Sequence, residues 1–147
     1  MQRSGPPLFA QPLATWERDG LKAALLRAGL PIDDIAQDGP LFWRFERDDV
    51  PVGFAGIEVH GTDALLRSLV TLPPVRQRGV GGAMVAKMET EARARGARAI
   101  YLMANDGAFF AKLGYAACDH DRVPPAIAAS APFASERAGA TAMVKAI

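Results

Sequence analysis

Residues 68–85 read SLVTLPPVRQRGVGGAMV, a sequence typical of a strand, a turn and a helix in succession. Its apolar start favours a strand, two prolines end the strand, and three glycines precede a helix. The first N–H groups of such a helix lack intrahelical partners, and Arg76 and Arg78 place positive charge beside them. This arrangement suits a phosphate-binding turn. A plain turn with solvated arginines is the alternative, because short glycine patterns recur by chance.

The rest of the chain alternates strands and helices around this turn. Thr15 is a predicted cap of the first helix and Gly29 its stop, Gly96 ends the second helix, and Gly114 ends the third. Strands are predicted over 7–13, 41–47, 50–61, 64–72, 97–104, from 115 to about His120, and over 140–147. An antiparallel meander followed by a β-α-β crossover gives a mixed α/β sheet with helices on its faces.

Length, charge and cysteine count limit the kinds of protein that this chain can be. The 147 residues fit a single domain over 1–147, and the formal net charge of +1 gives no general attraction to nucleic acid or to a membrane. The single cysteine, Cys118, excludes an internal disulfide and a cysteine metal cluster. Residues 1–13 lack the apolar core of a signal peptide, and no apolar run spans a bilayer. We therefore expect a cytoplasmic protein without a metal, and a homodimer is compatible with the sequence.

Two familiar nucleotide-binding loops do not fit the glycine turn. A Walker loop ends in Gly-Lys-Ser/Thr, which is absent here. A dinucleotide fingerprint needs a third glycine, and counting from Gly79 that position is Met84.

The stretch resembles the acetyl-coenzyme A binding motif of the GNAT superfamily of N-acetyltransferases: a strand, a proline, then Q/R-x-x-G-x-G/A opening a long helix. FFAKLGY at 109–115 resembles the second signature of that family, often written Y-x-K-x-G-F. The predicted order of elements agrees with the family. The resemblance implies a mixed central sheet of about six or seven strands flanked by about four helices, with acetyl-coenzyme A as the cofactor.

A branch of the family is also suggested. GLPIDDI at 29–35, the region 53–81 and the tail 123–147 resemble short acetyltransferases encoded beside arsenic-resistance genes. Those proteins are similar to the catalytic domain of amino-acid N-acetyltransferases such as N-acetylglutamate synthase. That group usually carries a Cys-Pro pair in the tail, where this chain has SERAGA.

The resemblance assigns the cofactor contacts. Residues 77–82 would cradle the pyrophosphate, and two neighbouring parallel strands would splay apart so that the edge at Leu69, Val70 and Thr71 pairs with the pantetheine arm. A backbone N–H near Thr71 would polarise the thioester carbonyl. The full set of expected cofactor residues is Leu69, Val70, Thr71, Arg76, Gln77, Arg78, Gly79, Val80, Gly81, Gly82, Asn105 and Phe110.

Glu58 is the candidate general base, acting directly or through water, with a solvated glutamate as the alternative. His60 is the second candidate, although it falls at a turn. Arg67 interrupts a very apolar strand and therefore needs an anionic partner. That partner is either a substrate carboxylate or a structural ion pair with Asp63 or Glu58. Ser68 would assist either role.

The second signature departs from the family at the general acid. Phe110 occupies the place of the tyrosine that often protonates the departing thiolate, so either water or another residue supplies the proton. Tyr115 replaces the usual phenylalanine, and its hydroxyl is expected at a core position. Asn105 resembles an asparagine that hydrogen-bonds the cofactor arm, with a helix N-cap at Asn105 or Asp106 as the alternative. Lys112 is expected to be exposed.

These observations favour an N-acetyltransferase that transfers an acetyl group to a small-molecule amine, in particular an amino acid or an analogue. Acetylation of a protein N-terminus or lysine is a second hypothesis. A third, of a different class, is a non-catalytic module that binds acyl-coenzyme A, since the usual tyrosine is missing.

Overall fold

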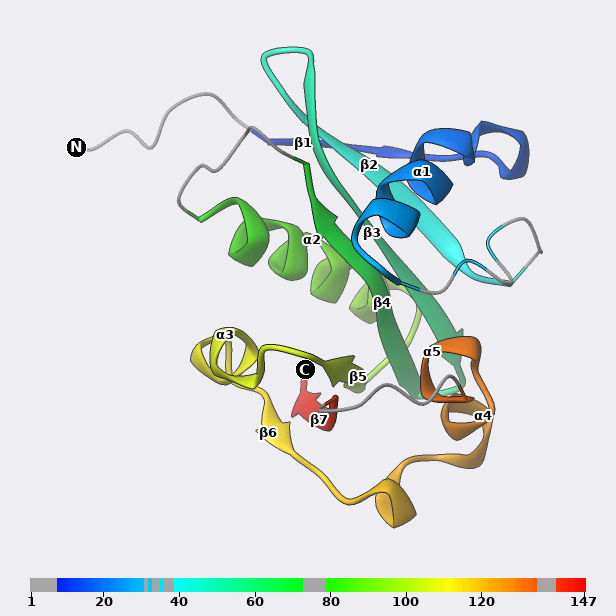
Figure 1. The fold of residues 1–147 in the computed structure, drawn as a ribbon. Coiled ribbons are helices and arrows are strands. Elements are labelled where there is room, and N and C mark those ends of the chain that lie inside the picture. Colours follow the sequence, from blue (N-terminus) through cyan, green and yellow to red (C-terminus); the bar gives the residue numbers. More distant parts are fainter. Residues whose placement is uncertain (1–7, 31, 33–34, 36–38, 73–78, 135–139) are drawn as a thin grey trace.

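The computed structural model describes residues 8–147 except 31, 33–34, 36–38, 73–78 and 135–139 (Figure 1). Its centre is a seven-stranded sheet in the order β1-β2-β3-β4-β5-β7-β6. The strands are β1 (Phe9–Pro12), β2 (Leu41–Arg47), β3 (Val50–His60), β4 (Asp63–Thr71), β5 (Ala99–Ala104), β6 (Ala116–Ala117) and β7 (Thr141–Ala146). The described helices are α1 (Asp19–Arg27), α2 (Val80–Ala94), α3 (Gly107–Lys112), α4 (Pro125–Ala128) and α5 (Ala131–Ala134), with 3-10 turns η1 (Thr15–Glu17) and η2 (His120–Arg122).

The sheet is mixed, as the sequence predicts. Strands β1 to β4 form an antiparallel meander, and α2 then crosses over so that β5 lies parallel to β4. Strand β7 runs antiparallel between β5 and β6. The β2–β3 turn at Asp48 and Asp49 has φ values of 53° and 62°, the left-handed conformation of a tight hairpin. Gly96, with φ of 95°, follows the last turn of α2, which confirms the predicted stop.

Two predicted boundaries are wrong by more than two residues. Helix α1 begins at Asp19 and not at Thr15, because Thr15–Glu17 form a 3-10 turn in which the N–H of Ala14 donates to Glu17 Oε1 over 2.9 Å. Strand β6 ends at Ala117 and does not continue to His120. From Asp119 onward the chain satisfies its backbone locally, as in the bond from the N–H of Arg122 to the carbonyl of Asp119 (2.9 Å).

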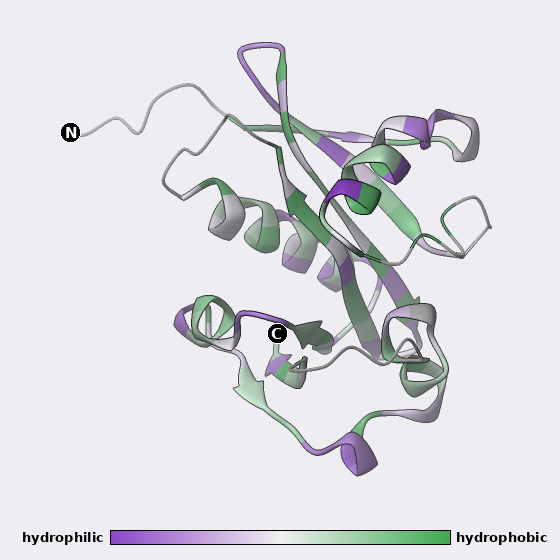
Figure 2. Ribbon diagram, viewed as in Figure 1, coloured by the Kyte–Doolittle hydropathy of each residue, from purple (hydrophilic) through white to green (hydrophobic). Residues whose placement is uncertain are grey.

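Consecutive side chains along a strand pack into separate hydrophobic cores on the two faces of the sheet. Trp43 packs with Met84 and Met88 under α2, whereas Phe42 packs with Leu21 and Leu25 under α1. This division follows from the alternation of side chains along a strand. Hydrophilic residues gather instead at the β2–β3 turn and at η2 (Figure 2).

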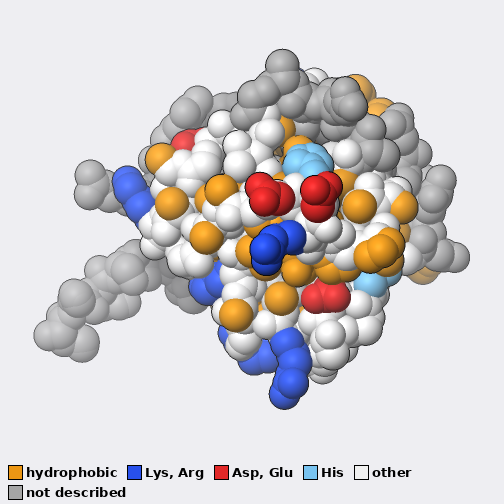
Figure 3. Space-filling model, turned by 90° about the horizontal axis from the view of Figure 1, so that it is seen from below, with side chains coloured by type: hydrophobic (Ala, Val, Ile, Leu, Met, Phe, Trp, Pro, Cys, Tyr) orange, Lys and Arg blue, Asp and Glu red, His pale blue; other side chains and the backbone are white. Residues whose placement is uncertain are grey.

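A third cluster lies under the short helices α4 and α5, where Ile127 and Phe133 cover Leu65 and Ala142. Seen from below, the described acidic, basic and histidine side chains are interspersed among hydrophobic ones (Figure 3). On this face, the part of the chain that the structure describes forms no broad patch of one charge. The electrostatic potential in a cavity is therefore set mainly by the charged side chains next to it.

Candidate active site

Strands β4 and β5 lie side by side only at their beginnings. Their parallel pairing joins Asp63–Leu65 to Ala99–Tyr101, although β4 continues to Thr71 and β5 to Ala104. Among the described residues, none pairs with β4 on its β5 side beyond Leu65. The expected splay between the two parallel strands is thus confirmed.

The backbone of β4 faces this gap at its far end. The N–H of Leu72 donates to the carbonyl of Val52 on β3 over 2.9 Å. Because N–H groups point alternately to the two sides of a strand, the N–H of Thr71 faces the gap. An open strand edge of this kind can accept an extended ligand through main-chain hydrogen bonds.

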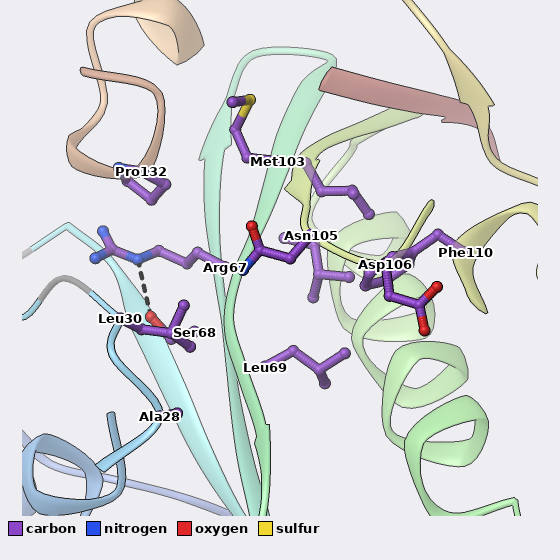
Figure 4. A pocket seen from close by; sticks show the side chains of 12 residues that line it. Ala28, Leu30, Arg67, Ser68, Leu69, Met103, Asn105, Asp106, Phe110 and Pro132 are labelled. Atoms are coloured by element: carbon purple, nitrogen blue, oxygen red, sulfur yellow. Dashed lines mark hydrogen bonds between the residues drawn. The ribbon is translucent and has the colours of Figure 1, made fainter. Parts of the chain in front are cut away.

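One cavity of about 240 Å³ opens beside the gap. Figure 4 shows Arg67 and Ser68 on one side of it, Asp106 and Phe110 on the other, and Asn105 between them. Its wall combines β4, the ends of α1 and β5, helix α3, and Pro132 of α5, through Ala28, Leu30, Leu66, Arg67, Ser68, Leu69, Leu102, Met103, Asn105, Asp106, Phe110 and Pro132. Five predicted site residues from two distant regions of the chain therefore meet at one cavity: Arg67, Ser68, Leu69, Asn105 and Phe110.

A second cavity of about 360 Å³ lies at the start of α2 and shares Leu69 with the first. Its lining consists of Leu69, Thr71, Gly79, Gly81, Gly82 and Phe109. Val70 and Val80 pack into the cores on opposite faces, so their side chains do not line it. The predicted cofactor residues Arg76, Gln77 and Arg78 lie outside the described residues.

The glycine turn gives the second cavity its shape. Gly79 precedes α2 with φ of 80°, and the first helical bond runs from the N–H of Ala83 to the carbonyl of Gly79 over 2.9 Å. A Cβ on Gly81 would lie 3.0 Å from Cζ of Phe109. The absence of a side chain at Gly81 therefore lets the Phe109 ring approach the first turn of the helix. The N–H groups of this turn form a favourable environment for an anion.

A β-bulge positions Arg67 and Ser68. Gly56 pairs with Arg67 and Phe54 with Val70, so Ser68 and Leu69 together face one residue of β3. Ser68 has φ of 58°, which is strained for a residue with a side chain. Within this bulge, Arg67 Nε donates to Ser68 Oγ over 3.3 Å. Both polar side chains consequently reach the same cavity wall.

Arg67 forms an ion pair with Glu58, which is one of the two roles that the sequence leaves open. Arg67 Nη1 lies 2.5 Å from Glu58 Oε2, and the Arg67 side chain is 1% exposed. Glu58 Oε1 lies 3.3 Å from His60 Nε2. Glu58 lines neither of the two cavities, but it contacts Arg67, which lines the first.

Aromatic rings of α3 line both cavities. Phe109 lines the second and Phe110 the first, and their rings meet edge to face at 4.9 Å. The N–H of Phe109 donates to Asp106 Oδ1 over 3.3 Å, so the N-cap is Asp106 and not Asn105. Lys112 is exposed, as expected.

Tyr115 lines neither cavity. It is 3% exposed, and its hydroxyl donates to Glu89 Oε2 over 2.9 Å. Burial raises the pKa of Tyr115 well above its ordinary range, and the charge of Glu89 raises it further. Tyr115 is therefore a buried hydrogen-bond donor, which confirms the expected core position. Sequence reasoning missed Glu89, although a glutamate on the apolar face of α2 with Val85, Met88 and Ala92 was a detectable signal.

Two further properties concern the whole described chain. Among the described residues, no group of three or more histidine, cysteine, aspartate or glutamate side chains could hold a metal ion. No described helix combines the length and the apolar character required to cross a membrane.

The sequence matches one known protein family. Residues 9–115 match the model of the acetyltransferase (GNAT) family. No curated protein matches the sequence significantly.

Solved structures share the fold at low sequence identity. N-acetylglutamate synthase from Neisseria gonorrhoeae, complexed with coenzyme A and N-acetyl-glutamate, has a TM-score of 0.74 at 17% identity over 94% of this chain and 35% of its own. Rv2747 from Mycobacterium tuberculosis, in complex with coenzyme A and NLQ, has a TM-score of 0.75 at 15% identity over 95% and 99%. Aminoglycoside 6'-acetyltransferase type Ii has a TM-score of 0.65 at 23% identity over 94% and 96%. The chain spans about a third of the length of the synthase.

Proposed function

Because the chain belongs to the GNAT family of acetyltransferases, we propose that it transfers the acetyl group of acetyl-coenzyme A to the primary amine of a small molecule. An amino acid or an analogue is the proposed acceptor class. The observation that carries the proposal is the pair of cavities that meet at Leu69 on the open edge of β4. One contains the helix start suited to an anion, and the other contains Arg67.

The second cavity fits the diphosphate of the cofactor. The N–H groups at Gly81 and Gly82 begin α2, and no Cβ obstructs the approach at either position. Arg76, Gln77 and Arg78 complete the proposed contacts. Structural neighbours crystallised with coenzyme A support this assignment.

The edge of β4 would hold the pantetheine arm. Leu69, Val70 and Thr71 would contribute backbone groups, while Asn105 and Phe110 would form the opposite wall. Acetyl-coenzyme A supplies the acetyl group as an activated thioester. The N–H of Thr71, which faces the gap, would stabilise negative charge on the carbonyl oxygen during attack.

Arg67 and Ser68 would orient the acceptor in the first cavity. A guanidinium group binds carboxylates through paired N–H donors, so Arg67 favours an acceptor that carries a carboxylate beside its amine. The N-acetyl-glutamate in the Neisseria gonorrhoeae complex supports this class of acceptor. With both reactants held in place, the amine would attack directly in a ternary complex.

Glu58 would remove a proton from the acceptor amine through a water molecule, since it contacts Arg67 but lines neither cavity. Phe110 has no proton to donate, and the hydroxyl of Tyr115 is bonded to Glu89. We therefore assign protonation of the departing sulfur to water.

Two observations favour a second candidate function, a non-catalytic module that binds acyl-coenzyme A. Glu58 is held by Arg67, and Phe110 lacks the hydroxyl group of the family tyrosine. An assay of thiol release with a panel of amines, together with calorimetry for coenzyme A, separates the two. Release that depends on an amine supports the enzyme, whereas binding with no turnover for any amine supports the module.

A further inference from the structure

Helix α3 carries the two aromatic walls of the cavities, yet it buries none of its own six residues. Its start is fixed by the exposed bond to Asp106. A helix this short is not stable in isolation, and its Phe109 and Phe110 are only partly buried where they pack against the main core. The contacts just beyond its C-terminal end therefore help to decide where Phe109 and Phe110 lie.

Tyr115 is the first buried residue after α3, and it is joined to the helix. Its N–H donates to the carbonyl of Phe110 over 3.1 Å, and the rings of the two residues lie 5.8 Å apart in an edge-to-face arrangement. The left-handed turn at Gly114, with φ of 98°, brings Tyr115 under the helix. Tyr115 is thus in direct contact with the end of α3.

The hydroxyl of Tyr115 is anchored in turn by a partly buried charged cluster. It donates to Glu89 Oε2 over 2.9 Å, and Lys145 Nζ lies 3.0 Å from Oε2 and 3.2 Å from Oε1 of the same carboxylate. Lys145 also lies over the Tyr115 ring at 5.6 Å and against the turn at Gly114. A hydrogen bond to a charged acceptor is stronger than one between neutral groups.

The cluster also connects Tyr115 to helix α2, because Glu89 belongs to that helix. Glu89 lies in the third turn of α2, while Gly81 lies in its first turn directly under the Phe109 ring. Helix α3 and the residues that follow it therefore contact α2 through Phe109 at Gly81, through Leu113 at Gly82 and through Tyr115 at Glu89. Of these three contacts between described residues, only the one through Tyr115 is a hydrogen bond.

We propose that Tyr115, Glu89 and Lys145 form an anchor that positions α3 over the first turn of α2, and that Tyr115 is a positioning residue for the cofactor cavity. The part that concerns the cofactor rests on the proposed function. The anchor itself does not, because it is a property of the unliganded protein. Tyr115 acts through Phe109 and Phe110 and touches no reactant.

Hydrogen exchange of the unliganded protein tests the anchor. The useful probes are the N–H groups of Leu113, Gly114 and Tyr115, which bond to carbonyls at the end of α3. Tyr115→Phe removes only the hydroxyl, and we expect exchange at these three groups to become about tenfold faster. Tyr101→Phe, the matched control on β5, should leave them unchanged. Glu89→Gln should accelerate the same three groups.

Calorimetry with coenzyme A tests the consequence. Tyr115→Phe should raise its Kd by about tenfold, and the KM for acetyl-coenzyme A should rise by a similar factor while kcat changes less, because Tyr115 touches no reactant. Unchanged exchange at the three groups, or equal acceleration in the β2–β3 hairpin, would overturn the anchor. Faster exchange with an unchanged Kd would overturn the positioning role. If the wild-type protein does not bind coenzyme A, the proposed function fails, while the exchange result still decides the anchor.

Discussion

Replacement of Gly81 by aspartate should separate binding from folding. Gly81 lies in the first turn of α2 and lines the second cavity. A Cβ there would lie 3.0 Å from Cζ and 3.3 Å from Cε1 of Phe109, so the half-buried ring must shift by a few tenths of an ångström. The backbone at Gly81 is helical and accepts a side chain. We therefore expect Gly81→Asp to fold.

The size of each effect follows from this position. Relief of glycine flexibility stabilises the fold by about 0.4–1 kcal/mol, and an acidic residue in the first turn of a helix adds about 0.3–1 kcal/mol. These gains offset the contact with Phe109, so the free energy of unfolding should change by no more than about 1 kcal/mol. A carboxylate about 5 Å from a phosphate charge costs about 3 kcal/mol at an effective dielectric constant of about 20. Affinity should then fall by at least about a hundredfold.

The assay is calorimetry of coenzyme A binding beside thermal unfolding, with Gly81→Ala as the matched control. Alanine adds the same Cβ without the charge, so the difference between the two variants isolates repulsion of the diphosphate. That difference should shrink at about 1 M salt, where the screening length is about 3 Å. Equal affinity of wild type and Gly81→Asp, with both folded, would refute the assignment of the diphosphate to this turn.

Three other predictions concern the charged groups. Arg67→Ala should raise the KM for acceptors that carry a carboxylate and leave the affinity for coenzyme A unchanged. A loss of about 3–5 kcal/mol in the free energy of unfolding, without that selective change in KM, would instead identify the ion pair between Arg67 and Glu58 as structural. Glu58→Gln should lower kcat and alter its pH profile, and wild-type kinetics would exclude Glu58 as the base. Burial, and to a smaller extent the charge of Glu89, raises the pKa of Tyr115 in the folded protein above its ordinary value of 10.0. The unfolded chain therefore loses the Tyr115 proton first as the pH rises. In denaturant titrations, the stability advantage of wild type over Tyr115→Phe should be constant below about pH 10 and fall above it. A difference that does not vary up to pH 11 would contradict the pKa shift.

The sequence was sufficient for the order of the strands, for helices α1 to α3, for the crossover and for the glycine turn, but it did not predict the short helices α4 and α5. These features depend on neighbouring residues: alternation within 41–47, the paired aspartates at 48–49, and the glycine at 96 that ends α2. Local signals were weaker at boundaries. Thr15 has the chemistry of a helix cap, but the bond between Ala14 and Glu17 forms a separate turn first.

The contacts between distant side chains could not be predicted from the sequence and are known only from the folded chain. The bulge at Ser68 places that side chain and Arg67 on one wall, and the pairing of β3 with β4 brings Glu58 to Arg67. Likewise, no local pattern joins Glu89 to Tyr115 and Lys145, which come from three separate elements. A strand or turn is favoured by forces within a few residues, whereas an ion pair across the sheet depends on register and on burial from all sides.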